Sequence, residues 1–306
     1  MAENTVKKIA TRESYGNSLK ELAEEFPNLV VLDADLAAAT KTGIFRKAYP
    51  DRHIDCGIAE SNMMGVAAGL SLVGKIPFVS SFAMFAAGRA FEQVRNSIGY
   101  PHLNVKIGAT HAGITVGEDG ATHQCNEDIA LMRTIPGMVV MCPSDDVEAR
   151  AAVRAALEYE GPVYIRFGRA AVPVINDHPG YHFEIGKGTV VREGKDVTIV
   201  ATGICVDSAL GAAKMLEEEG ISAEVVNICT IKPLDEEIII NSAKKTGKVV
   251  TVEEHSVIGG LGSAVCDCLC ANHPVPVKKV GMQDVFGESG SAAALVEKYG
   301  LDAKGV

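Results

Sequence analysis

The stretch His53-Ile54-Asp55-Cys56-Gly57-Ile58-Ala59-Glu60-Ser61-Asn62 contains a short apolar strand followed by a turn that carries one carboxylate. The apolar run 63–72 follows at once and has the character of a helix. Glu60 therefore lies where a strand passes into a helix, with apolar neighbours on both sides. The helix dipole also favours an acid at this position, so position alone leaves a purely structural role open. We take Glu60 as the first candidate functional residue.

The same alternation of strand and helix continues along the chain, which predicts an α/β fold with mostly parallel sheets covered by helices on both faces. The strands expected from apolar runs are 29–32, 77–80, 105–109, 138–142, 163–167, 197–201, 224–228, 248–252 and 275–280. The helices expected from apolar periodicity are 12–26, 65–73, 88–97, 147–157, 208–219, 236–246 and 263–271.

A break in this alternation divides the chain into two parts. Residues 171–188 are rich in polar side chains and contain Pro173, Pro179 and Gly180, a composition typical of a linker. With 306 residues, the chain is long enough for two domains that each bury a core. We expect a first domain over 1–172, a linker over 173–188 and a second domain over 189–306.

The composition limits the possible partners and the location. The chain has 47% hydrophobic residues and a formal net charge of −10, so it lacks the basic excess expected of a nucleic-acid or acidic-membrane partner. Residues 1–8 lack the apolar segment of a signal peptide, and no run of about eighteen apolar residues is present to span a bilayer. We therefore expect a cytoplasmic protein with no membrane or nucleic-acid partner.

The eight cysteines are dispersed among apolar segments, as expected of reduced and buried thiols. Cys266, Cys268 and Cys270 form the one cluster that suggests a metal. Alternate residues of a helix point in different directions, so this predicted helical segment favours packing over a shared metal ion.

A second motif, Ser80-Ser81-Phe82-Ala83-Met84-Phe85-Ala86-Ala87-Gly88-Arg89, follows a strand and precedes a helix. It places Phe82 and Phe85 where a planar ring could stack on them. Two phenylalanines at this spacing also suit an ordinary core.

A third motif, Thr110-His111-Ala112-Gly113-Ile114-Thr115-Val116-Gly117-Glu118-Asp119-Gly120-Ala121-Thr122-His123-Gln124, forms a loop after the strand 105–109. It combines two histidines and two acids with glycines that permit tight turns. Loops of this kind at strand ends often carry functional residues.

Together, the Ile-Ala-Glu turn, the aromatic pair and the Gly-Glu-Asp-Gly-x-Thr-His-Gln loop resemble the pyrimidine-binding half of the transketolase family. The resemblance covers residues 12–169 and is specific, because the motifs occur in the family's order at compatible spacing. It implies the coenzyme thiamine diphosphate. Glu60 would then be the acid that hydrogen-bonds to the pyrimidine ring, a role that suits a carboxyl group in an apolar setting. Phe82 and Phe85 would form the wall on which this ring stacks.

The resemblance also implies a substrate channel lined by His111, Asp119 and His123. His123 would shuttle protons to sugar oxygens, Asp119 would accept a hydrogen bond from a hydroxyl, and His111 would donate one to a hydroxyl or phosphate. A structural role stays open for each histidine taken alone.

Arginines at two places in the first domain complete the expected site. By the same resemblance, Arg12 and Arg169 would bind the terminal phosphate of a sugar phosphate, which an arginine pair does well. Arg166 is a further candidate at the end of the strand 163–167. The alternative is that these are solvated surface charges.

The family binds the diphosphate through Mg²⁺ with a Gly-Asp-Gly segment and a later Asn, and the sequence offers no equivalent outside the Glu118-Asp119-Gly120 loop. The resemblance therefore implies a C-terminal subunit of a split transketolase, inactive alone. A separate N-terminal subunit would supply the Mg²⁺ ligands, and the assembly would be a heterotetramer.

The activity implied is transfer of a two-carbon ketol unit from a ketose phosphate to an aldose phosphate. Deoxyxylulose phosphate synthase carries similar motifs, and its Arg-x-x-Arg segment resembles Arg166 to Arg169. The beta subunit of a 2-oxoacid dehydrogenase is also a separate chain of this size, although it lacks the third motif. A non-catalytic regulatory subunit is the alternative from another class.

Overall fold

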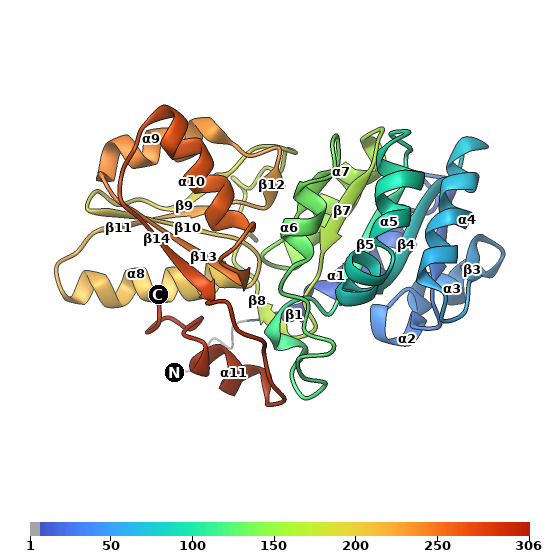
Figure 1. The fold of residues 1–306 in the computed structure, drawn as a ribbon, viewed down its shortest axis with the longest axis horizontal. Helices are drawn as coiled ribbons and strands as arrows, with labels where there is room; N and C mark the ends of the chain where they lie inside the picture. Colours follow the sequence, from blue (N-terminus) through green and yellow to red (C-terminus); the bar gives the residue numbers. More distant parts are fainter. Residues whose placement is uncertain (1–6) are drawn as a thin grey trace.

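The computed structural model describes residues 7–306, which form two mostly parallel sheets, each covered by helices and lying side by side (Figure 1). The predicted α/β fold with two such sheets is confirmed. Residues 1–6, with which the expected first domain begins, lie outside the described residues. Within 7–306, no helix is both long and apolar enough to cross a bilayer.

The first sheet has seven strands in the order β12-β6-β7-β5-β4-β2-β3, and only the pair β12–β6 is antiparallel. Because the remaining strands run in one direction, their carboxyl ends meet at one edge, where ligands bind in open α/β sheets. The strands of this sheet are β2 (Leu29–Asp33), β3 (His53–Asp55), β4 (Ile76–Phe82), β5 (Lys106–Thr110), β6 (Val139–Met141), β7 (Val163–Arg166) and β12 (Thr230–Lys232).

Helices cover both faces of this sheet and enclose a separate apolar core on each. One face carries α1 (Thr11–Leu22), α3 (Gly43–Ala48) and α7 (Asp146–Glu158), with the short α2 (Ala37–Thr40) and a 3₁₀ turn (Pro50–Arg52) nearby. The other face carries α4 (Glu60–Leu72), α6 (Asp128–Arg133) and a helical segment that follows β4.

The helical segment after β4 differs from the regular helix 88–97 that the sequence predicts. It consists of a π-helix (Met84–Arg89), α5 (Phe91–Gln93) and a second π-helix (Val94–Gly99). The backbone N–H of Ala90 accordingly bonds to the carbonyl of Phe85, five residues earlier. Apolar periodicity locates a helix on a sheet but does not reveal this widened hydrogen-bond pattern.

The second sheet has five strands in the order β14-β13-β10-β11-β9, with only β9 antiparallel to its neighbour. Its helices again enclose a core on each face, α8 on one and α9 with α10 on the other. The elements of this part are β9 (Thr189–Arg192), β10 (Val197–Ala201), α8 (Cys205–Glu218), β11 (Ala223–Asn227), α9 (Glu236–Thr246), β13 (Val249–Ser256), α10 (Leu261–Asn272), β14 (Val277–Met282) and α11 (Ala292–Lys298).

Short elements tie distant parts of the chain together. β12 joins the edge of the first sheet although it follows β11 of the second. β1 (Lys8–Ala10) pairs antiparallel with β8 (Ala171–Pro173), and α11 packs on the 3₁₀ turn Ile114–Val116. β1, β8 and β12 have three residues each and none is apolar throughout, so the sequence does not predict them. The equally short β3 and β6 lie in segments for which the sequence does predict strands.

Candidate functional site

Glu60 is the first residue of α4, and its side chain is buried, with 2% of its surface exposed. Both carboxylate oxygens accept hydrogen bonds from Nη1 of Arg89, at 3.2 and 3.0 Å. The turn before Glu60 is held by Asp55, whose Oδ1 accepts bonds from the backbone N–H groups of Gly57 and Asp35. The strand end β3 thus fixes the approach to the carboxylate.

Phe82 ends β4, and Phe85 lies in the first turn of the π-helix that follows. Their rings are stacked with centroids 6.0 Å apart and planes inclined by 14°. The guanidinium carbon of Arg89 lies 4.5 Å from the centre of the Phe85 ring. The guanidinium of Arg89 therefore contacts both Phe85 and Glu60.

His111 follows β5 directly and has a positive φ of 56°, which is uncommon for a residue with a side chain and recurs at functional sites. Its ring stacks on Phe82 at 3.9 Å between centroids. Burial, with the positive charges of Arg12 and Arg169, lowers the pKa of His111 to about 3. The imidazole is therefore neutral at physiological pH.

The two ring nitrogens of His111 have different partners. Nε2 lies 3.4 Å from Nη1 of Arg12, which can only donate, so Nε2 is the acceptor. Nδ1 then carries the proton and donates to Oγ1 of Thr110 at 2.9 Å. The donor role predicted for His111 would need the other tautomer, with Arg12 turned away.

The Gly-rich loop places His123 and Asp119 beside these groups. The ring of His123 meets Phe85 edge-on at 5.5 Å between centroids, and its Nδ1 lies 2.9 Å from Oγ1 of Thr122. Asp119 is exposed, with its carboxylate 3.9 Å from Nη1 of Arg169. A positive φ at Gly120 turns the loop, and a Cβ there would lie 2.5 Å from a serine hydroxyl, so a side chain would not fit.

Arg12 and Arg169 lie together, with Nε of Arg12 donating to the carbonyl of Arg169 at 3.3 Å. Both line a hollow of about 440 Å³ that also contains Lys8 and Arg150. Glu13 is the acid in this lining. The concentration of positive charge suits an anion.

Arg166 is not part of this group. It is 5% exposed, and its Nε donates to the carboxylate of Asp128 at 2.9 Å. Its Nη2 donates to the carbonyl of Glu254 at 2.7 Å. These bonds hold the guanidinium of Arg166 between the two sheets. Because the group is buried and already paired there, it is not available to bind a phosphate.

With Arg89 as a link, the other predicted residues form a continuous series of contacts. The series runs from Glu60 through Arg89 to Phe85 and Phe82, then to His111, Arg12 and Arg169, with His123 and Asp119 beside it. A buried carboxylate next to a flat aromatic face fits an aminopyrimidine ring, which needs an acid partner and a stacking surface.

Sequence reasoning missed Arg89, which contacts the two residues at the start of this series. The signal was present, because Arg89 ends the quoted Phe82 motif and lies four residues after Phe85, one helical turn away. The partners of Arg166 were also missed, since an ion pair between segments far apart in sequence leaves no local pattern.

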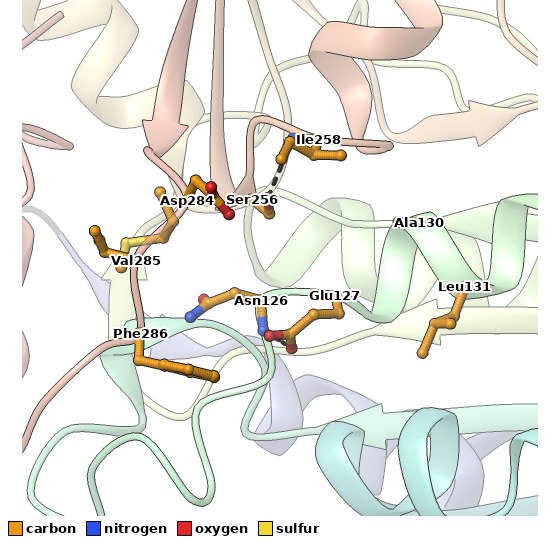
Figure 2. Close-up of a pocket in the computed structure, with 10 residues that line it drawn as sticks. Asn126, Glu127, Ala130, Leu131, Ser256, Ile258, Asp284, Val285 and Phe286 are labelled. Carbon is orange, nitrogen blue, oxygen red and sulfur yellow. Dashed lines mark hydrogen bonds between the residues drawn. The ribbon is translucent and has the colours of Figure 1, made fainter.

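A separate pocket of about 400 Å³ lies at the junction of the two sheets (Figure 2). None of the predicted site residues lines it. Its lining residues are Asn126, Glu127, Ala130, Leu131, Ser256, Ile258, Met282, Asp284, Val285 and Phe286. We assign no catalytic role to this pocket.

Over residues 7–306, no group of three or more His, Cys, Asp or Glu side chains is arranged to hold a metal ion. On α10, Cys266 is half-buried, Cys268 is buried and Cys270 is exposed, so the three thiols face different surroundings.

The fold defines a class of proteins that join two α/β domains, each built on a mostly parallel sheet covered by helices. Residues 7–174 match the family "Transketolase, pyrimidine binding domain", and residues 186–306 match "Transketolase, C-terminal domain". The chain belongs to the transketolase family.

Similar proteins include a transketolase C-terminal section, a transketolase subunit and a split gene transketolase. A protein of Methanocaldococcus jannaschii described as a transketolase C-terminal section is 52% identical over 297 residues, covering 96% of this chain and 93% of that protein. A 6-deoxy-6-sulfo-D-fructose transketolase subunit of Clostridium sp. is 50% identical, covering 96% and 91%. A solved structure described as a split gene transketolase, inactive beta4 tetramer, is 59% identical with a TM-score of 0.89, covering 98% and 96%. This chain is thus a C-terminal subunit of the transketolase family.

Proposed function

We propose that this chain, together with a separate N-terminal subunit, transfers a two-carbon ketol unit from a ketose phosphate to an aldose phosphate. The observation that carries the proposal is that the buried carboxylate of Glu60, the aromatic pair, His111 and the paired guanidinium groups of Arg12 and Arg169 lie in one series of contacts, in which Arg89 joins Glu60 to Phe85. It offers an acid, an aromatic face, two imidazoles and an anion site, which ketol transfer between sugar phosphates requires.

The proposed coenzyme is thiamine diphosphate, which supplies a nucleophilic carbon able to cleave the bond next to a ketose carbonyl. Glu60 would hydrogen-bond to the aminopyrimidine and hold a proton there, while Phe82 and Phe85 would stack against the ring. His123 lies edge-on to Phe85 and would move protons to and from the sugar oxygens.

Arg12 and Arg169 would bind the terminal anion of the substrate in the basic hollow that both residues line. Phosphate and sulfonate both present several acceptor oxygens to such a pair. Because one similar subunit is named for a 6-deoxy-6-sulfo-D-fructose substrate, sulfonated sugars belong in the test beside sugar phosphates. We leave Arg166 out of the proposed substrate contacts.

The proposed partner carries the diphosphate-binding domain and supplies the Mg²⁺ ligands, and the proposed assembly is a heterotetramer. The similar split transketolase described as an inactive beta4 tetramer supports this dependence on a second chain.

The test is to mix the chain with a candidate N-terminal subunit, Mg²⁺ and thiamine diphosphate, and to assay two reactions. Ketol transfer should appear only in the mixture. Activity confined to pyruvate-dependent condensation would move the assignment to a synthase of the deoxyxylulose phosphate type. A complex that assembles but is inactive in both assays would favour a non-catalytic subunit, and turnover by the unmixed chain would refute the split-subunit proposal.

A matched variant tests the role of Glu60. Glu60→Gln keeps the size of the side chain but cannot hold the proton, so we expect a loss of at least about 10²-fold in kcat with unchanged assembly. Size-exclusion chromatography with the partner provides the assembly control. Retained turnover would remove Glu60 from the proposed mechanism.

A further inference from the structure

Arg89 makes all the hydrogen bonds to the Glu60 carboxylate that occur within the described residues. Its guanidinium also lies over the Phe85 ring, 4.5 Å from the centroid. The buried acid and the aromatic face, both assigned above to the coenzyme ring, are thus already in contact with one planar side chain.

A guanidinium resembles an aminopyrimidine in the features that matter here. Both are flat, both present N–H groups at an edge, and both stack face-on against an aromatic ring. The carboxylate of Glu60 and the open face of Phe85 cannot serve two such groups in the same position at once. Coenzyme binding and the Arg89 contact therefore exclude each other.

We propose that Arg89 is a positioning residue that takes the place of the coenzyme's pyrimidine ring in the unloaded subunit, and that it must leave Glu60 before the coenzyme binds. The inference rests on the proposed function, since it needs Glu60 and Phe85 to form the pyrimidine site. Its consequence is that Arg89 lowers the affinity for thiamine diphosphate while it stabilises the empty subunit.

The surroundings of Arg89 allow this exchange. Its side chain is 51% exposed, whereas that of Glu60 is 2% exposed. Turning Arg89 outward returns its charge to water, which costs little. The buried carboxylate left behind loses its partner, a state that is costly until another donor arrives. In the empty site, the Glu60 carboxylate is therefore paired with Arg89, a side chain that can turn out into solvent.

The location of Arg89 supports a functional role for the contact. It ends the π-helix Met84–Arg89, and such widened turns recur at functional sites. Phe85 and Arg89 lie one turn apart on this segment, so a single element presents both the stacking face and the group that covers it.

The test measures two quantities for Arg89→Met, which keeps the apolar stem and removes the guanidinium. Calorimetric titration of thiamine diphosphate into the complex of both subunits with Mg²⁺ gives the coenzyme Kd, and thermal unfolding of the chain alone gives Tm. We expect the Kd to fall by roughly three- to fivefold, the size of effect of a partly exposed ion pair. We expect the Tm to fall as well, because Glu60 is left unpaired.

Opposite effects on binding and stability are the distinguishing result, because a purely structural role for Arg89 would weaken both. Arg95→Met is the matched control: Arg95 is an exposed arginine of the following π-helix (Val94–Gly99) and bonds to its neighbour Asn96. It should leave the Kd unchanged. If Arg89→Met fails to fold, Arg89→Gln keeps a donor for Glu60 without the charge and should also bind the coenzyme more tightly than wild type.

An unchanged or weaker affinity in both Arg89 variants would overturn the inference. Absence of coenzyme binding by the wild-type complex would instead count against the proposed function. The two failures are thus distinguishable in one set of titrations.

Discussion

Burial and the neighbouring charges of Arg12 and Arg169 oppose protonation of the His111 imidazole. Its ring stacks on Phe82, and Arg12 donates to Nε2. The positive φ at His111 turns the side chain back toward these groups at the end of β5. The conformation of one residue thus decides that the site contains a neutral histidine next to two arginines.

The first prediction concerns the protonation of His111. Because its pKa is lowered to about 3, its Cε1–H NMR signal should not titrate between about pH 5 and 8. The signal can be assigned by its loss in His111→Asn. A titration midpoint inside that range would contradict the environment described here.

The same shift affects stability with a definite sign. An unfolded histidine takes up a proton near pH 6.5 and the folded one only near 3, so the unfolded state binds more protons between these values. The contribution of His111 to the free energy of unfolding should therefore decrease as the pH falls below about 6.5. His111→Asn should reduce the pH dependence of chemical denaturation in this range.

At the scale of elements, local patterns predicted most helices and strands of both sheets. The buried strands β4 and β5 and the amphipathic α7 are long enough to show their periods. The sequence did not predict β12, because Thr230–Lys232 forms no apolar run and its partner β6 is far away along the chain. Non-local pairing is the information that a single sequence lacks.

In the candidate site, too, local motifs were predictable from the sequence and contacts between distant segments were not. Motif order indicated Glu60, Phe82 and His111 together, and the structure brings these residues into one series of contacts. Arg166 was a candidate because it ends the predicted strand 163–167 and forms an Arg-x-x-Arg segment with Arg169. Yet Arg166 ends β7 and points into the junction of the two sheets, whereas Arg169 lies in the hollow with Arg12.

The second prediction compares these two arginines. Arg166 pairs with Asp128 in a fully buried position, so Arg166→Met should lower the free energy of unfolding by about 3–5 kcal/mol. Arg169 is partly exposed, so Arg169→Met should cost at most about 1 kcal/mol while raising the KM for a sugar phosphate. Denaturant titration and steady-state kinetics provide the measurements. A stable Arg166→Met variant with a raised KM would restore Arg166 to the substrate site.

Glu148 joins α7 to the linker and to β11. Its Oε2 accepts bonds from the backbone and hydroxyl of Ser144, and its Oε1 accepts bonds from Asn227 and Tyr181. Burial raises the pKa of Glu148 to about 7 despite these hydrogen bonds. A titrating carboxyl group thus lies at the point where three segments meet.

The third prediction follows from this raised pKa. The folded state holds the Glu148 proton up to about pH 7 and the unfolded state only up to about 4.5, so this contribution to stability is present below pH 4.5 and is lost as the pH rises through 7. Glu148→Gln should remove a dependence on the order of 3 kcal/mol across this range. Denaturation of both proteins at several pH values provides the measurement, and parallel curves would contradict the prediction.

At the scale of the whole molecule, the two sheets are coupled by contacts that do not pass through the linker. The backbone N–H of Thr115 donates to Glu254 of β13 at 2.6 Å, and that of Ala130 donates to His255 at 3.3 Å. Together with the bonds of Arg166 and the pairing of β12 with β6, these contacts hold the two halves together and stabilise each of them.

The fourth prediction is that the halves do not fold well when separated. A fragment ending at residue 174 lacks β12 and leaves the edge of β6 open, and it also lacks Glu254 beside Arg166. We expect it to aggregate or to unfold at lower denaturant concentration than the whole chain. Co-expression with residues 175–306 should restore a folded complex, which circular dichroism and gel filtration would detect. An equally stable isolated fragment would contradict this coupling.

Because β12 belongs to the first sheet, that sheet cannot be completed until part of the second half has been synthesised. When β7 leaves the ribosome, the sheet to which it belongs still lacks its outermost strand, which is translated only after the linker and β9, β10 and β11. During synthesis, the outer edge of β6 in the N-terminal half therefore stays unpaired. The first sheet is completed only when β12 has been translated with the second half of the chain.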